Sequence, residues 1–106
     1  MHTIVISTCA NRREADKIAR DIVGRRLVAC VNVLPVRSCY RWNGKVRVDR
    51  EYLIIAKTRS ERFTKLKSRI LALHSYDLPE IISMRIVDGY KKYLDWIDSE
   101  VREWNF

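Results

Sequence analysis

Residues 27–58, "LVACVNVLPVRSCYRWNGKVRVDREYLIIAKT", predict two long strands joined by a tight turn. Both flanks are rich in β-branched and aromatic residues, which favour a strand over a surface helix. Asn43 and Gly44 tolerate the positive φ angles that a two-residue hairpin turn requires. Pro35 removes one amide donor from the first strand, so it indicates a bend, a bulge or a sheet edge. The sequence therefore predicts a β-hairpin over residues 27–42 and 45–58.

A strand and a helix are predicted before this hairpin. Residues 3–8, "TIVIST", form a β-branched run of strand length. Asn11 is a favourable helix cap, and Glu14 stands three residues later, which is an asparagine variant of the capping box. Apolar residues then recur on one helical face: Ala15, Ile18, Ala19, Ile22 and Val23. Basic Arg25 and Arg26 suit the negative end of the helix dipole, so we expect the helix to end there.

A helix, a strand and a last helix are predicted after the hairpin. Ser60 is expected to cap the first of these helices, which must end before Pro79. Residues 80–87, "EIISMRIV", predict the fourth strand, and Asp88 is expected to cap the last helix. Both helices have an apolar stripe: Phe63, Leu66, Ile70 and Leu73 in one, and Tyr93, Leu94, Ile97 and Val101 in the other.

The predicted order is β-α-β-β-α-β followed by a C-terminal helix, which is the split β-α-β pattern of an α+β fold. Right-handed crossovers place the two main helices on one face of a four-stranded antiparallel sheet. A chain of 106 residues fits a single domain over residues 1–106. The other face needs a cover, and strands of about a dozen residues, near 40 Å long, overreach so small a domain. We therefore expect the hairpin to pair with another copy of the chain.

Composition favours a compact protein, since 47% of the residues are hydrophobic and only three are glycine. The sequence has no run of about 18 apolar residues and no secretory leader pattern, so we expect a cytoplasmic protein without a membrane span. Cys9, Cys30 and Cys39 are odd in number and match neither a disulfide framework nor a paired zinc motif. Reduced thiols are therefore expected.

The net charge of +8 attracts phosphates and acidic partners at low salt. However, the strand "VRVDREYLIIAK" (46–57) lacks the aromatic residues with which ferredoxin-like RNA binders stack bases, so no specific nucleic acid is expected. The chain also has no glycine-rich phosphate loop, nucleophile elbow or His-x-x-x-His pair. We therefore expect no enzymatic activity.

"HSYDLPEI" (74–81) carries the chemistry that the sequence offers for metal binding. His74 is expected at a helix C-terminus, where it either caps the helix or binds a ligand. Glu80 adds a carboxylate nearby. Cys9 precedes a helix whose dipole is expected to lower the pKa of the thiol. A set of imidazole, carboxylate and thiol suits copper or zinc better than magnesium.

Other candidate residues concern subunit contacts. Tyr40 and Trp42 share a face of the hairpin and Tyr93 and Trp96 roughly share a face of the last helix, so we expect all four in an interface. Lys57, Glu51 and Tyr76 are candidates for a cleft between subunits that accepts a small anion, although Lys57 is equally consistent with a solvated strand end. Cys30 and Cys39 are expected to be structural.

Five motifs together resemble the CutA divalent-cation tolerance family: "ACVNV" (29–33), "SCYRWNGKV" (38–46), "EYLIIAKT" (51–58), "HSYDLPEI" (74–81) and "YLDWI" (93–97). This resemblance covers nearly the whole chain. It implies a ferredoxin-like fold, a homotrimer similar to PII signal proteins, and tolerance of copper and other divalent cations, with no established reaction. The family usually has proline where this chain has Ser75, and a thiol where it has Ser7.

The function expected from this resemblance is a trimeric tolerance or response protein that binds Cu²⁺ or another divalent cation weakly near His74, Glu80 and Cys9. The alternative hypothesis is a PII-like signalling or interaction module, with a small ligand in the intersubunit cleft and an unidentified protein partner.

Overall fold

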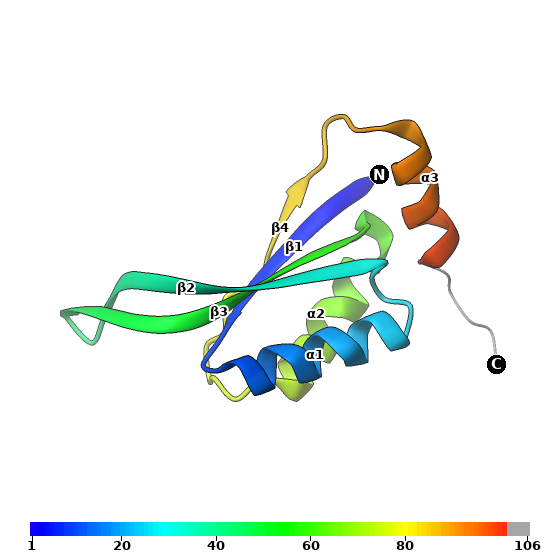
Figure 1. Ribbon diagram of the computed structural model, residues 1–106. Helices are drawn as coiled ribbons and strands as arrows, with labels where there is room; N and C mark the ends of the chain where they lie inside the picture. Colours follow the sequence, from blue (N-terminus) through cyan, green and yellow to red (C-terminus); the bar gives the residue numbers. More distant parts are fainter. Residues whose placement is uncertain (102–106) are drawn as a thin grey trace.

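The computed structural model describes residues 1–101. Its elements follow the predicted order and confirm the α+β class (Figure 1). They are β1 (His2–Cys9), α1 (Arg12–Gly24), β2 (Cys30–Trp42), β3 (Lys45–Arg59), a 3-10 turn (Ser60–Arg62), α2 (Phe63–Leu73), β4 (Ile82–Arg85) and α3 (Lys91–Glu100).

The four strands form one antiparallel sheet in the order β2-β3-β1-β4. Helices α1 and α2 lie together on one face of the sheet, as predicted (Figure 1). Alternate residues of β1 point toward these helices and are buried: Thr3, Val5, Ser7 and Cys9. The main core lies between this face and the apolar stripes of the two helices, which contribute Ala15, Ile18, Ile22, Leu66 and Ile70.

The hairpin is regular along its whole length. Its register is continuous from the pair Cys30 and Lys57 to the pair Trp42 and Lys45, so β2 has no bulge. The turn is tight, because Asn43 has a φ of 50° and Gly44 a φ of 74°. Of the three expectations for Pro35, the sheet edge is confirmed, since β2 is an outer strand. Residues 27–29 belong to the connection that precedes β2.

The outer half of the hairpin extends past the rest of the molecule (Figure 1). All residues from 39 to 50 are exposed, and the molecule measures 44 × 32 × 21 Å. Helix α3 covers one end of the sheet face opposite α1 and α2, where Asp98 bonds to His2 and Arg59. Ile82 and Met84 on the same face stay 47% exposed. The second face is thus only partly covered, as expected.

Two predicted caps are wrong. Ser60 begins a 3-10 turn and its side chain caps no helix, while its backbone amide donates to the carbonyl of Met1. Asp88 accepts a hydrogen bond from the amide of Gly89, and α3 begins later, with Tyr90 as a cap that makes no side-chain bond. In both cases the residue bonds to another group, and its side chain caps no helix.

The fourth strand is shorter than predicted. Only residues 82–85 pair with β1, opposite Thr3 to Ile6. The remainder of the predicted strand leads into and out of this pairing as irregular chain. Within residues 1–101, no helix combines the length and apolar character needed to cross a membrane.

Candidate metal site

Three side chains with metal-binding donors meet where β1, α1 and α2 come together. Cys9 ends β1, Glu14 lies in the first turn of α1, and His74 is the C-cap of α2. One donor atom from each, namely Sγ, a carboxylate oxygen and a ring nitrogen, lies within 4.8 Å of the other two. Cys9 and the His74 side chain are fully buried, and the Glu14 side chain is 13% exposed. The fold therefore brings together a thiol, a carboxylate and an imidazole.

His74 is held by both of its ring nitrogens. Nε2 lies 2.8 Å from the carbonyl oxygen of Thr8, which can only accept, so Nε2 carries a proton. Nδ1 accepts a hydrogen bond from the amide of Tyr76 at 3.1 Å and lies 3.3 Å from Glu14 Oε1. The backbone amide of His74 donates to Ile70. The predicted cap is thus confirmed, and a metal would have to compete for Nδ1.

Glu14 forms only one half of the predicted capping box. Its backbone amide donates to Asn11 Oδ1 at 2.9 Å, as predicted. Its carboxylate instead accepts two hydrogen bonds from Ser75, one from the backbone amide at 3.2 Å and one from Oγ at 2.7 Å. The carboxylate that the box would direct back to the cap is therefore turned toward the end of α2.

The prediction of a lowered thiol pKa is wrong. Burial, followed by the negative charges of Glu14 and Glu51, raises the pKa of Cys9 to about 12. These effects outweigh the dipole of α1. Cys9 is consequently a protonated thiol at neutral pH, and it loses a proton when it binds a metal.

The other predicted site residues lie in three separate places. Glu80 is exposed and lies outside the cluster. Glu51 is buried and accepts a hydrogen bond from the Tyr76 hydroxyl at 2.9 Å. Lys57, six residues further along β3 and so about 20 Å away, bonds to Asn32 instead. Within one chain, the predicted cleft residues therefore do not all meet.

The four predicted interface aromatics form two exposed pairs. Tyr40 and Trp42 lie on the overhanging part of β2, and Tyr93 and Trp96 lie on α3 at the opposite end of the molecule (Figure 1). All four are between 39% and 44% exposed. The rings of Tyr93 and Trp96 are 5.5 Å apart. Their role in an interface stays a prediction.

The three thiols and Ser7 differ in burial and in their distance from the cluster. Ser7 is fully buried, and its hydroxyl has no hydrogen-bond partner within residues 1–101. Cys9 lies two residues further along the same face of β1. Cys30 is half-buried, with Sγ 3.9 Å from Lys57 Nζ, and Cys39 is exposed on the hairpin. Cys9 is thus the thiol that belongs to the cluster.

Sequence reasoning missed Glu14 as a member of the cluster. Its place in the capping box gave it a sufficient local role, and its partner Ser75 lies 61 residues away. The signal that could have found it is the position of Glu14 in the first turn of a helix directly after Cys9. A side chain there can point back toward the end of the preceding strand.

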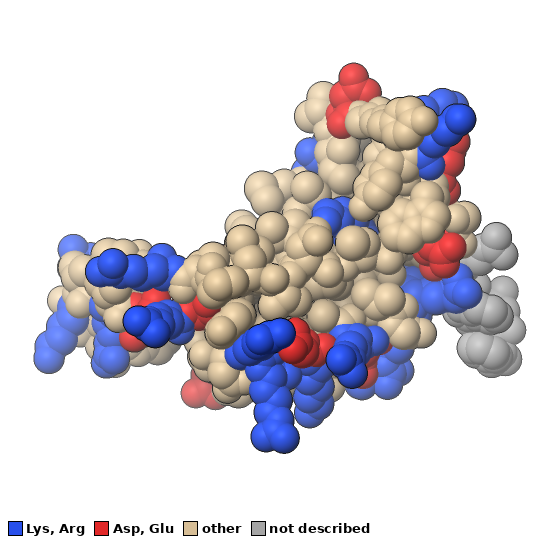
Figure 2. Space-filling model, in the orientation of Figure 1, with Lys and Arg blue, Asp and Glu red and all other residues tan. Residues whose placement is uncertain are grey.

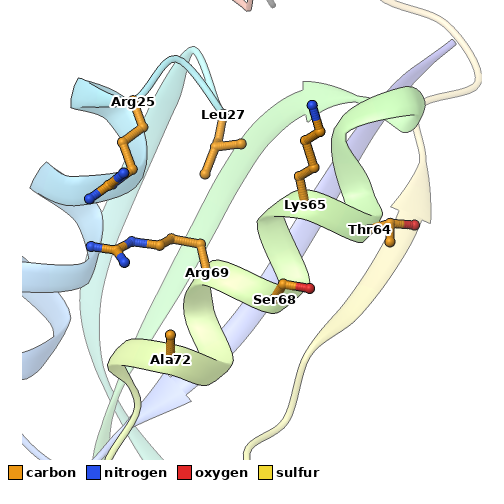
Figure 3. A pocket seen from close by; sticks show the side chains of 7 residues that line it. All are labelled: Arg25, Leu27, Thr64, Lys65, Ser68, Arg69 and Ala72. Carbon is orange, nitrogen blue, oxygen red and sulfur yellow. The ribbon is translucent and has the colours of Figure 1, made fainter.

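A hollow in the surface lies elsewhere, between the end of α1 and α2 (Figure 3). Its volume is about 510 Å³, and it is lined by Arg25, Leu27, Thr64, Lys65, Ser68, Arg69 and Ala72. The guanidinium groups of Arg25 and Arg69 both bond to Asp21, at 3.0 Å and 2.8 Å. The bonds from Arg69 on α2 to Asp21 on α1 join the two helices. None of the predicted site residues lines this hollow.

The fold and the cluster define a small ferredoxin-like α+β protein with a buried thiol, a buried imidazole and a partly buried carboxylate in one place. The model of the CutA1 divalent ion tolerance protein family matches residues 3–100. The chain belongs to this family.

Two relatives of the chain are matched over almost the whole of their own length. The divalent-cation tolerance protein CutA of Archaeoglobus fulgidus is 40% identical over 95% of this chain and 99% of its own. A solved structure described as the periplasmic divalent cation tolerance protein CutA of that organism has a TM-score of 0.94, with 39% identity over 96% of this chain and 100% of that one. The divalent-cation tolerance protein CutA of Thermus thermophilus is 44% identical over 92% of this chain and 95% of its own length.

Proposed function

We propose that this chain is a divalent-cation tolerance protein that acts as a homotrimer and binds a divalent cation weakly at Cys9, Glu14 and His74. The observation that carries the proposal is the meeting of their three donor atoms within 4.8 Å. The names of the relatives support a role in cation tolerance. The role is proposed to be binding without catalysis, in the cytoplasm.

The donor set favours a borderline or soft metal ion. Thiolate and imidazole suit copper and zinc, whereas magnesium prefers oxygen ligands and retained water. Glu14 and Glu51 place negative charge near the thiol. The charges that disfavour the thiolate favour a divalent cation beside it. Cu²⁺ or a related ion is therefore the proposed ligand.

Weak binding is expected because metal binding costs the cluster a proton and a hydrogen bond. Cys9 must release its proton, and the pKa of about 12 makes this costly at neutral pH. Binding through Nδ1 of His74 also breaks the hydrogen bond from the Tyr76 amide. Apparent affinity should consequently rise with pH, because the metal and the proton compete for the same sulfur atom.

The trimer is proposed from the surface of the single chain. Lys and Arg gather on the hairpin and along the helix layer, while the middle of the visible face is largely uncharged (Figure 2). Exposed apolar residues of the open sheet face include Leu34, Ile82 and Met84. The outer edge of β2 has no strand beside it within residues 1–101. A neighbouring copy would cover both features.

Calorimetric titration of Zn²⁺, a related divalent ion that does not oxidise thiols, into the reduced protein tests the metal site. We expect the variants His74→Ala and Glu14→Gln to bind at least about tenfold more weakly than the parent. Glu80→Gln removes the same charge as Glu14→Gln from a carboxylate outside the cluster, so it should bind like the parent. Equal binding by the parent and Glu14→Gln, or a loss confined to Glu80→Gln, would contradict the proposed donor set.

A further inference from the structure

Ser75 makes two hydrogen bonds to a single carboxylate. Its Oγ donates to Glu14 Oε2 at 2.7 Å, and its backbone amide donates to Glu14 Oε1 at 3.2 Å. Ser75 directly follows His74, so one short segment fixes the imidazole and holds the carboxylate. A proline at position 75 would have neither donor.

These bonds decide which oxygen of Glu14 faces the other members of the cluster. A glutamate side chain turns about several bonds, so a carboxylate near a helix start adopts many positions when nothing holds it. The bond from Oγ occupies Oε2, and the other oxygen, Oε1, lies 3.3 Å from His74 Nδ1. Ser75 thereby reduces the freedom of Glu14 and leaves Oε1 directed at the imidazole.

We propose that Ser75 is a positioning residue that orients Glu14 for a divalent cation and so raises the affinity of the cluster. This inference rests on the proposed function. Hydrogen bonds to a ligating carboxylate fix its orientation and commonly contribute strongly to metal affinity. Ser75 itself lies on the surface, and its amide and its Oγ both donate to Glu14.

A purely structural role makes a different prediction. Ser75 and Glu14 connect the end of α2 to the start of α1, so their bonds also tie two helices together. If this were their only effect, the loss of Oγ would lower stability and leave metal affinity unchanged. The experiment therefore measures both quantities on the same variants.

The probe is Co²⁺, titrated into the reduced full-length chain and followed by absorption. A charge-transfer band that the parent shows and Cys9→Ser lacks reports bonding of cobalt to the Cys9 thiolate, and so to the cluster itself. Ser75→Ala keeps the backbone amide and loses Oγ, so we expect it to bind Co²⁺ about tenfold more weakly. Ser75→Thr keeps a hydroxyl and should restore the affinity. Ser68→Ala, on the exposed surface of α2, is the matched control and should bind like the parent.

Unfolding by urea, measured without metal, completes the test. A weaker Ser75→Ala site that Ser75→Thr restores supports the proposal. If the parent shows the cobalt band and Ser75→Ala has the same affinity and spectrum, the positioning role is overturned and the metal site stands. If the parent shows no cobalt–thiolate band at all, the proposed function and the role of Ser75 are both overturned.

Discussion

At the scale of a single residue, replacing Ser7 should stabilise the protein. Its buried hydroxyl has no hydrogen-bond partner within residues 1–101, so folding takes it out of water without a replacement bond. Ser7→Ala should therefore raise the free energy of unfolding by about 1 kcal/mol. Urea unfolding monitored by circular dichroism measures the change.

Thr58 supplies the matched control for Ser7. It is also fully buried in the same sheet, but its Oγ1 donates to the carbonyl of Leu27 at 2.7 Å. Thr58→Val should lower the free energy of unfolding by about 1 to 2 kcal/mol, because the buried carbonyl loses its bond. Equal effects of the two substitutions would show that the Ser7 hydroxyl has a partner in solution.

The residues that sequence reasoning placed well are those with a local cause. Asn43 and Gly44 form the predicted turn, because positive φ is a property of the two residues themselves. The pKa of Cys9 was predicted in the wrong direction, because burial and two carboxylates act on it from other parts of the fold. A helix dipole can be inferred from one segment, whereas desolvation depends on the whole structure.

At the scale of the elements, Asp21 connects α1 to α2. Arg69 bonds to both of its carboxylate oxygens at 2.8 Å, and Arg25 bonds to Oδ1 at 3.0 Å. The hydrogen bonds from Arg69, with help from Arg25, hold the pKa of Asp21 below its usual value. The folded state thus binds this proton less readily than the unfolded state. The stabilisation is present above the unfolded pKa and is lost as the pH falls through the folded pKa.

Asp21→Asn should lower the free energy of unfolding by about 1 kcal/mol near neutral pH. The difference from the parent should shrink as the pH falls below about 4, because the parent carboxylate then gains a proton as well. Urea unfolding at several pH values measures this convergence. Asp16→Asn is the control, since Asp16 is more exposed and its contact with Arg12 is 3.7 Å long. A constant difference at all pH values would contradict the linkage.

Elements with a strong periodic pattern were predicted in the right order and place, whereas several of their ends were predicted wrongly. The stripe of α2, including Leu66 and Ile70, packs on the sheet as expected. Ser60 and Asp88 were expected to cap helices, since both residue types commonly do so. In the structure, the backbone of Ser60 bonds to Met1 and the side chain of Asp88 bonds to Gly89. The partner of a polar group depends on which segment lies beside it.

For the whole molecule, we predict a trimer whose contacts include the open face of the sheet. Met84 is on β4 opposite Ile4, away from the main core, and is 47% exposed. Met84→Glu adds a charge to this apolar face and should shift the particle from three times the chain mass toward the 12.6 kDa of one chain. Analytical ultracentrifugation at micromolar concentration measures the mass.

Leu71→Glu is the matched control for this experiment. Leu71 is 50% exposed on α2, which lies on the opposite side of the sheet. This variant adds the same charge and should remain a trimer. A parent protein that sediments as a folded single chain would overturn the proposed assembly, and with it the interface role of the two exposed aromatic pairs.

The fold could be predicted at this scale because the order of the elements leaves few arrangements open. The candidate site could be predicted only in part. Cys9 and His74 were found from their chemistry, but Glu14 became a partner only when α1 and α2 were seen side by side. Which distant segments lie side by side is a property of the complete fold. A local sequence pattern can therefore indicate a single candidate ligand, but not the other residues that meet it.

The exposed edge of the long outer strand β2 also affects the tendency of the protein to aggregate. A bare strand edge accepts any similar strand, and repeated addition in one direction gives a fibre instead of a closed ring. Pro35 interrupts the row of amide donors on β2, and Arg37 and Arg41 add like charges that repel another copy in a shifted register. The strand edge that we propose to pair with a neighbouring copy therefore disfavours the repeated addition of further copies.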